Sequence, residues 1–147
     1  MKKSKTHEKV LEKFGYPGAL IKEYDYWYWL LRPEQITLGS SILITKECYF
    51  NYSDLTREHF LEFGKIVKEI EKTLGNTFNF DKMNYLMLMM VDPSVHYHVI
   101  PRYENIRILN DKEYIDNGFP GIPNFTFVNK TNIEEFNNIK INLINSL

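Results

Sequence analysis

The chain has 147 residues, of which 44% are hydrophobic, 25% charged and 15% aromatic, with a net charge of −1 and one cysteine. This length suits a single domain, 1–147, and the composition excludes a largely disordered chain. The near-zero charge gives no global attraction for nucleic acid, and a lone cysteine excludes an internal disulfide. No apolar run is long enough to cross a membrane, and residues 1–7 lack the apolar stretch of a secretory signal. We therefore expect a cytoplasmic protein with no nucleic-acid or membrane partner.

The first predicted elements are a short helix and several strands. Residues 6–14 have the spacing of an amphipathic helix, with Thr6 as its N-cap and Gly15 at its end. Residues 19–31 are rich in β-formers and predict strands, and apolar residues at both alternating positions indicate a sheet covered on both faces. Residues 41–45 (SILIT) predict a buried strand.

The clearest helix is predicted over residues 54–74, where apolar side chains recur three and four positions apart. Asp54 or Thr56 can cap its N-terminus and Gly75 can end it. His59 is expected on the exposed side of this helix, in contact with solvent.

An antiparallel hairpin is predicted next, from the apolar runs at 83–90 and 95–100, with Pro101 ending the pairing or lying at an edge. A rigid loop at 118–123 and a helix-like pattern at 131–146 follow. This order of elements predicts an α+β fold: a mostly antiparallel sheet covered by one long helix and a few short helices.

The most informative stretch is 92–103 (DPSVHYHVIPRY). Alternate side chains of a strand share one face, so Ser94, His96 and His98 should lie on one face, with roughly 6.5–7 Å between alternate residues. The residues between them should point into the core. Two imidazoles directed at one place can attack phosphorus or carry protons near neutral pH.

The histidine pair alone leaves three interpretations open. The rings can be two half-exposed side chains on a sheet, a nucleophilic or acid–base site, or two ligands of a metal. A zinc site needs three or four protein ligands. The candidates for the remaining ligands have no recognisable spacing; they are Asp92, Cys48, His7 and His59.

Residues 95–103 (VHYHVIPRY) resemble the signature of the histidine-triad (HIT) family of nucleotide hydrolases and transferases, His-φ-His-φ-His-φ-φ followed by Pro-Arg, with φ apolar. Residues 35–46 are similar to the glycine-then-strand segment of that family. The resemblance covers about 26–103 and leaves 104–147 as a C-terminal extension. Within the extension, the loop at 118–123 resembles one in bacterial diadenosine-polyphosphate-hydrolase-like members.

The resemblance implies a fold and a reaction. The fold is a sheet of about five antiparallel strands with one long helix and a few short ones, commonly as a homodimer, for which the aromatic strand at 24–31 is a candidate interface. The substrate class is nucleoside 5′-phosphate anhydrides or phosphoramidates, with dinucleoside polyphosphates foremost. His96 is the implied nucleophile that forms a nucleotidyl-histidine, and His98 contacts the phosphate. No metal and no cofactor are implied.

The chain departs from the family pattern at four positions. Ser94 stands at the first signature histidine, Ser40 at the histidine after the glycine, and Cys48 at a further histidine position. Arg32 stands where the family has a ribose-binding Asn or Asp. In the family the first two positions lie together beside the nucleophile, so Ser94 and Ser40 are expected to form a small hydroxyl network there. The same departures favour the alternative of a nucleotide-binding protein with little turnover.

Five further residues are candidates for substrate binding. Trp27 and Trp29 can stack on a nucleobase, although packing in the core is the favoured interpretation. Arg32 and Arg102 can hold phosphate through paired hydrogen bonds, or be solvated. Asp92 fits the hairpin turn, and it can alternatively orient a histidine or a water molecule.

Overall fold

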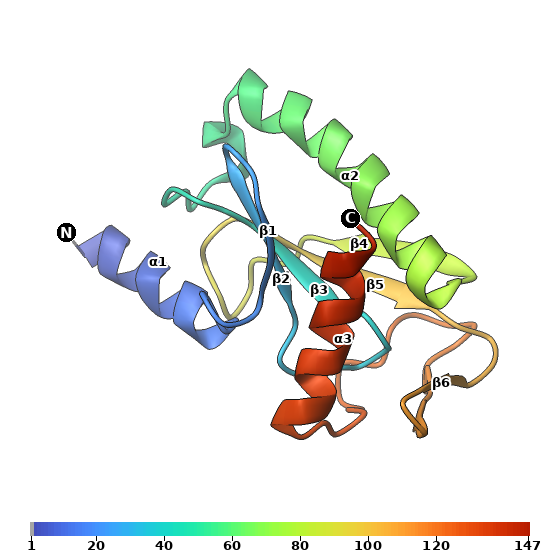
Figure 1. Cartoon of the computed structure of the whole chain (residues 1–147). Coiled ribbons are helices and arrows are strands. Elements are labelled where there is room, and N and C mark those ends of the chain that lie inside the picture. The colour runs from blue at the N-terminus through green and yellow to red at the C-terminus, as the bar shows by residue number, and fades with distance from the viewer. Residues whose placement is uncertain (1) are drawn as a thin grey trace.

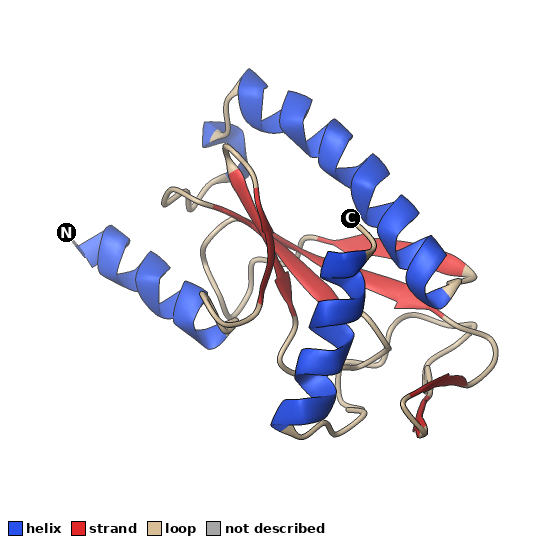
Figure 2. Cartoon of the chain, viewed as in Figure 1, coloured by secondary structure: helices blue, strands red, loops and turns tan. Residues whose placement is uncertain are grey.

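The computed structural model describes residues 2–147, so Met1, the first residue of the basic N-terminal stretch, lies outside the described residues (Figure 1). Within these residues, three α-helices are separated by two groups of strands, β1 to β3 and β4 to β7 (Figure 2). Their bounds, in chain order, are α1 (Lys2–Lys13), β1 (Leu20–Glu23), β2 (Trp27–Leu31), β3 (Ser41–Thr45), the 3-10 turn Tyr52–Asp54, α2 (Arg57–Phe78), β4 (Lys82–Leu86), β5 (His96–Arg102), β6 (Arg107–Leu109), β7 (Lys112–Tyr114) and α3 (Ile133–Asn145).

Strands β1 to β5 form one antiparallel sheet in the order β1-β2-β3-β5-β4. This confirms the predicted α+β class and the five-stranded sheet. β5 is an inner strand, held between β3 and β4, so its backbone has hydrogen-bonding partners on both sides. The small β6–β7 hairpin was not predicted, because its two three-residue strands are too short to show a periodic pattern.

Helices cover both faces of the sheet (Figure 1). On one face, apolar residues of α2 and α3 pack against β2, β3 and β5. On the other, Val10 and Leu11 of α1 pack against Leu30, Ile42 and Ile44. Both sets of alternating side chains are therefore buried, as the apolar character of residues 19–31 indicated.

The N-terminal helix α1 differs from its prediction in where it begins. It starts at Lys2 rather than at residue 6, so Thr6 lies inside the helix and does not cap it. Gly15 lies two residues after the end of α1 and has a φ of +88°. A Cβ at this position would lie only 2.8 Å from the Cβ of Ala19, so the turn is too tight for a side chain. This close turn brings the chain directly from α1 into β1 and fixes the helix against the sheet.

Thr56, one of the two predicted candidates, is the N-cap of α2, and a reciprocal pair of hydrogen bonds joins it to His59. The expectation that His59 is solvated is wrong: its side chain is buried, because its Nδ1 is the partner of Thr56 and its ring packs against Tyr26 and Tyr49. The helix also continues past Gly75 and ends at Asn79, which has the left-handed conformation.

The β4–β5 hairpin is confirmed, but its strands have other bounds. β4 ends at Leu86, shortly before Met89, which has a φ of 48°. Pro101 does not end β5; it pairs with Met83 beyond the part of the strand that β3 reaches. The predicted C-terminal helix is confirmed as α3, capped by Asn132. Among residues 2–147 there is no helix both long and apolar enough to cross a membrane.

Candidate active site

The two histidines of β5 lie on the face of the sheet that α1 covers. His96 pairs with Ile44 and His98 with Ile42, and both isoleucines pack against α1. The imidazole centroids are 5.0 Å apart, with the planes at 79°. The intervening Tyr97 packs on the opposite face. The predicted alternation along this strand is therefore confirmed.

One tautomer of His96 is selected by its backbone contact. Nδ1 of His96 lies 2.6 Å from the carbonyl oxygen of Ser94. A carbonyl only accepts, so Nδ1 carries the hydrogen and donates it. The lone pair of the neutral ring is then on Nε2, which is the nitrogen able to act as a nucleophile.

Aromatic side chains enclose the pair. The ring of Phe14, just after α1, lies 5.2 Å from that of His96 and 6.4 Å from that of His98, and Phe125 lies 5.3 Å from His98. The two histidines are only 2% and 9% exposed. They are therefore not the half-exposed pair that one interpretation expected.

Burial keeps both imidazoles neutral. It lowers the pKa of His96 below 6.5, which outweighs the smaller opposite effect of the Ser94 carbonyl. It lowers the pKa of His98 to about 4, helped by the repulsion that protonated His96 and the Arg32 guanidinium would exert on a second cation. Two unprotonated rings at neutral pH are what a nucleophile and its neighbour require.

Two cations, each paired with a carboxylate, lie at the mouth of the site: Lys13 with Asp92, and Arg32 with Glu34 at 3.7 Å. A pocket of about 360 Å³ is lined by Lys13, Phe14, Arg32, Pro33 and Glu34. The Arg32 guanidinium lies 5.6 Å from the ring of Phe125, and Lys13 forms an ion pair of 2.9 Å with Asp92. Asp92 is thus bound to Lys13 at the rim.

Two buried nitrogen atoms in this region have no hydrogen-bonding partner in the part of the chain that the structure describes. They are Nε of Arg32 and Nδ1 of His98. An unsatisfied buried polar atom costs free energy, so such atoms mark places where a ligand or water supplies the missing partner. A cation beside neutral imidazoles suits an anionic ligand.

The partner of Ser94 is His7 and not Ser40. Nδ1 of His7 lies 3.0 Å from Oγ of Ser94. Ser40 lies just before the first residue of β3, Ser41, which pairs with Val99. Ser94 lies near the other end of β3, where Ile44 pairs with His96. The expected network of Ser94 with Ser40 is therefore wrong; Ser40 is buried in a turn, where its hydroxyl bonds to Thr37.

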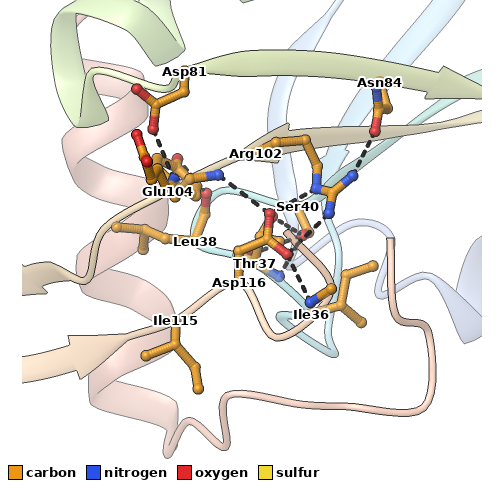
Figure 3. A network of polar contacts seen from close by, with 12 residues as sticks. Ile36, Thr37, Leu38, Ser40, Asp81, Asn84, Arg102, Glu104, Ile115 and Asp116 are labelled. Carbon is orange, nitrogen blue, oxygen red and sulfur yellow. Dashed lines mark hydrogen bonds and ion pairs between the residues drawn. The ribbon is translucent and has the colours of Figure 1, made fainter. Parts of the chain in front are cut away.

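Arg102 belongs to a structural network (Figure 3). Its Nε and one terminal nitrogen donate to the carboxylate of Asp116 at 2.6 and 3.1 Å, and the other nitrogen donates to Asn84 at 2.8 Å. The side chains of this ion pair are 4% and 1% exposed. Each guanidinium nitrogen of Arg102 is thus bonded inside the protein, so its contact with substrate is not supported and stays a prediction.

Trp27 and Trp29 do not reach the site either. Both are fully buried on the α2 face, where their indole N–H groups donate to the His59 carbonyl and to Ser41 Oγ. The interpretation that they pack in the core is the correct one, and neither contacts a nucleobase. β2 is also an inner strand and offers no free edge, but Tyr24, Tyr26 and Tyr28 are partly exposed, so an interface at residues 24–31 stays a prediction.

The candidate metal ligands do not gather around the histidine pair. His59 is on the other face, and His7 is bonded to Ser94 and to the Lys46 carbonyl. In residues 2–147 no group of three or more His, Cys, Asp or Glu side chains is placed to hold a metal ion. The residues present therefore do not fit the zinc site that one interpretation required.

Sequence reasoning missed four residues of the site or named them for another role: His7, Lys13, Phe14 and Phe125. The first three lie in or directly after α1, whose amphipathic pattern was visible. The pattern did not indicate which face of the sheet α1 covers. Phe125 lies in an irregular loop and gave no signal.

Comparison with known proteins gives a consistent result. The HIT domain family model matches residues 16–105. A histidine triad protein from Sinorhizobium meliloti has a TM-score of 0.74 at 18% identity, covering 95% of this chain and 94% of that one. A Zn-bound histidine triad family protein from Mycobacterium smegmatis has a TM-score of 0.58 at 16% identity, covering 88% and 86%. The diadenosine triphosphate hydrolase of Plasmodium falciparum has a TM-score of 0.56 at 19% identity, covering 68% and 83%. The curated proteins give no significant match.

Proposed function

Because this chain belongs to the HIT domain family of nucleotide-binding hydrolases and transferases, we propose that it cleaves nucleoside 5′-phosphate anhydrides or phosphoramidates with His96 as the nucleophile. The observation that carries the proposal is the 2.6 Å bond from Nδ1 of His96 to the Ser94 carbonyl. It leaves the lone pair on Nε2, beside His98 and near the Arg32 charge.

The proposed reaction has two steps. The Nε2 lone pair of His96 attacks the α-phosphorus, and the bond from phosphorus to the leaving-group oxygen or nitrogen breaks. Water, or another acceptor, then attacks the same phosphorus; the N–P bond breaks, its electrons return to Nε2, and the acceptor loses a proton. Dividing one displacement into two in this way is the advantage of a covalent intermediate.

The other residues of the site have supporting roles in the proposal. His98 and Arg32 stabilise the phosphate oxygens, which is the role that their two unpaired nitrogen atoms suit. Lys13 lies at the rim, where its ion pair with Asp92 holds it. Dinucleoside polyphosphates are the proposed substrate class, and the likeness to a diadenosine triphosphate hydrolase supports that choice.

The test is to trap the intermediate. We expect intact-mass spectrometry during turnover of diadenosine triphosphate to show the protein with one added adenylate, and we expect His96→Ala to lack both the adduct and turnover. Ser40→Ala is the matched control, because its hydroxyl lies outside the site. Turnover by His96→Ala at the wild-type rate would contradict the proposal.

A nucleotide-binding protein with little turnover is the second candidate. The observation that favours it is the position of Phe14 over both imidazoles, which restricts access to His96. Calorimetry with adenosine 5′-monophosphate, beside a sensitive turnover assay, separates the two. Binding without multiple turnover supports this candidate, and robust multiple turnover removes it.

A further inference from the structure

A buried histidine of α1 lies next to the nucleophile without contacting the reacting atoms. His7 is 5% exposed and comes from an element far in sequence from β5. Its Nε2 lies 3.1 Å from the carbonyl oxygen of Lys46, and its Nδ1 lies 3.0 Å from Oγ of Ser94. The ring therefore joins three segments: α1, the residue after β3, and the residues that lead into β5.

The two contacts define the direction of each hydrogen bond. The Lys46 carbonyl only accepts, so Nε2 of His7 carries the hydrogen and donates it. In the neutral ring Nδ1 is then an acceptor, and the hydroxyl of Ser94 donates to it. Burial lowers the pKa of His7, which agrees with a neutral ring at pH 7.

The same serine holds the nucleophile through its backbone. The Ser94 carbonyl accepts the Nδ1 hydrogen of His96 at 2.6 Å, and the following amide, Val95 N, donates to the Tyr49 carbonyl. The side chain of Ser94 is thus fixed by His7 while its carbonyl fixes His96. Rotation of the Ser94 backbone about its Cα–C bond would move that carbonyl and release the tautomer that places the lone pair on Nε2.

We propose that His7 is a positioning residue for His96: by accepting the Ser94 hydroxyl, it holds the Ser94 carbonyl where it selects the nucleophilic tautomer. This inference rests on the proposed function, because it assigns His7 a part in that reaction. Misplacement of a reacting group by about 1 Å can cost roughly 100-fold in rate, so a residue at this distance is able to control turnover.

The experiment removes Nδ1 of His7, which accepts the Ser94 hydroxyl, and then restores an acceptor at the same position. We expect His7→Leu to lower kcat by roughly 10- to 100-fold with KM changed by no more than about 3-fold, because ground-state binding does not use this bond. We expect His7→Asn, whose amide oxygen can accept the Ser94 hydroxyl, to recover part of the loss. Ser94→Ala removes the donor, and its combination with His7→Leu should be no worse than either change alone.

A second readout follows the tautomer itself. Long-range ¹H–¹⁵N NMR of histidine-labelled protein should show Nδ1–H of His96 in the wild type and a mixture of tautomers in His7→Leu and Ser94→Ala. His59→Leu, which changes an equally buried histidine on the other face, should leave the His96 tautomer as it is. If His7→Leu does not fold, Ser94→Ala tests the same bond from its other end.

The two proposals fail differently. An unchanged His96 tautomer in both His7→Leu and Ser94→Ala overturns the role of His7, whatever happens to kcat, and leaves the role of His96 standing. Wild-type turnover by His96→Ala overturns the reaction, while a shifted tautomer in His7→Leu still supports the positioning contact.

Discussion

The ring of Phe14 lies 5.2 Å from the ring of His96, with the two planes tilted by 48°. Phe14 follows α1, and His96 begins β5, so this contact joins the N-terminal helix to the middle of the sheet. Burial lowers the pKa of His96, and Phe14 is one of the residues that bury it. We expect Phe14 to control the basicity of His96 without taking part in the proposed reaction.

Replacing Phe14 tests that control. We expect Phe14→Ala to admit water and so to raise the pKa of His96 and of His98 toward 6.5, because burial is the largest cause of both depressions. NMR titration of the imidazole carbons measures both values, and circular dichroism checks that the variant folds. Phe63→Ala removes an aromatic ring from the opposite face of the sheet and should leave both titrations as they are. An unchanged His96 titration in Phe14→Ala would refute the control by Phe14.

The depressed pKa of His98 also predicts how stability depends on pH. The unfolded chain takes up a proton on this residue near pH 6.5, whereas the folded protein resists until about pH 4. Acid therefore favours the unfolded state, and stability is lost as the pH falls from 6.5 toward 4. His98→Gln should flatten this dependence by on the order of 3 kcal/mol, since one pKa unit corresponds to about 1.4 kcal/mol. Urea unfolding across this range measures it, and parallel curves for the two proteins would contradict the expectation.

Arg32 is expected to contribute to affinity. Its unpaired Nε is available to a phosphate oxygen, and a hydrogen bond to a charged group contributes about 1.5–3 kcal/mol. Arg32→Gln should therefore weaken binding of adenosine 5′-monophosphate by roughly 10-fold or more, as measured by calorimetry. Arg107→Gln is the matched control, because that guanidinium bonds to the carbonyls of Phe78, Asn79 and Asn105. Equal affinities for the wild type and Arg32→Gln would remove Arg32 from the site.

The buried ion pair between Arg102 and Asp116 predicts a large effect on stability. Asp116→Asn leaves the guanidinium buried without its counter-charge and should cost about 3–5 kcal/mol. Glu23→Gln breaks the exposed pair with Lys46 and should cost less than about 1 kcal/mol. Denaturant unfolding compares the two. Equal losses would show that the Arg102 pair is no more important than a surface pair.

The sequence allowed the prediction of features that depend on local pattern. The apolar spacing of residues 54–74 predicted α2, and the alternation around His96 placed both histidines on one face. These features follow from the 3.6-residue and two-residue periods of helix and strand, which a single segment reveals. Thr56 was one of two candidate caps, because threonine and aspartate side chains are preferred at that position.

The features that could not be predicted depend on contacts between distant segments. Trp27 and Trp29 alternate with tyrosines, so both faces of that strand are apolar and the pattern cannot distinguish the core from a ligand surface. Ser40 was placed beside Ser94 by alignment with a family pattern, but the register of β3 against β5 separates them. His7 is the partner of Ser94 instead, because α1 packs on the face of the sheet that holds His96 and His98. That packing depends on contacts with Ile42 and Ile44.

The alternation along β5 has a consequence for how this protein tolerates change. Tyr97 and Val99 point toward the layer of α2 and α3, where substitutions act on folding, whereas His96 and His98 point toward α1, where the proposed chemistry takes place. A mutational scan of residues 96–99 should therefore alternate: low abundance at Tyr97 and Val99, and normal abundance with lost activity at His96. Four consecutive residues of β5 would then record selection for folding and selection for activity in turn.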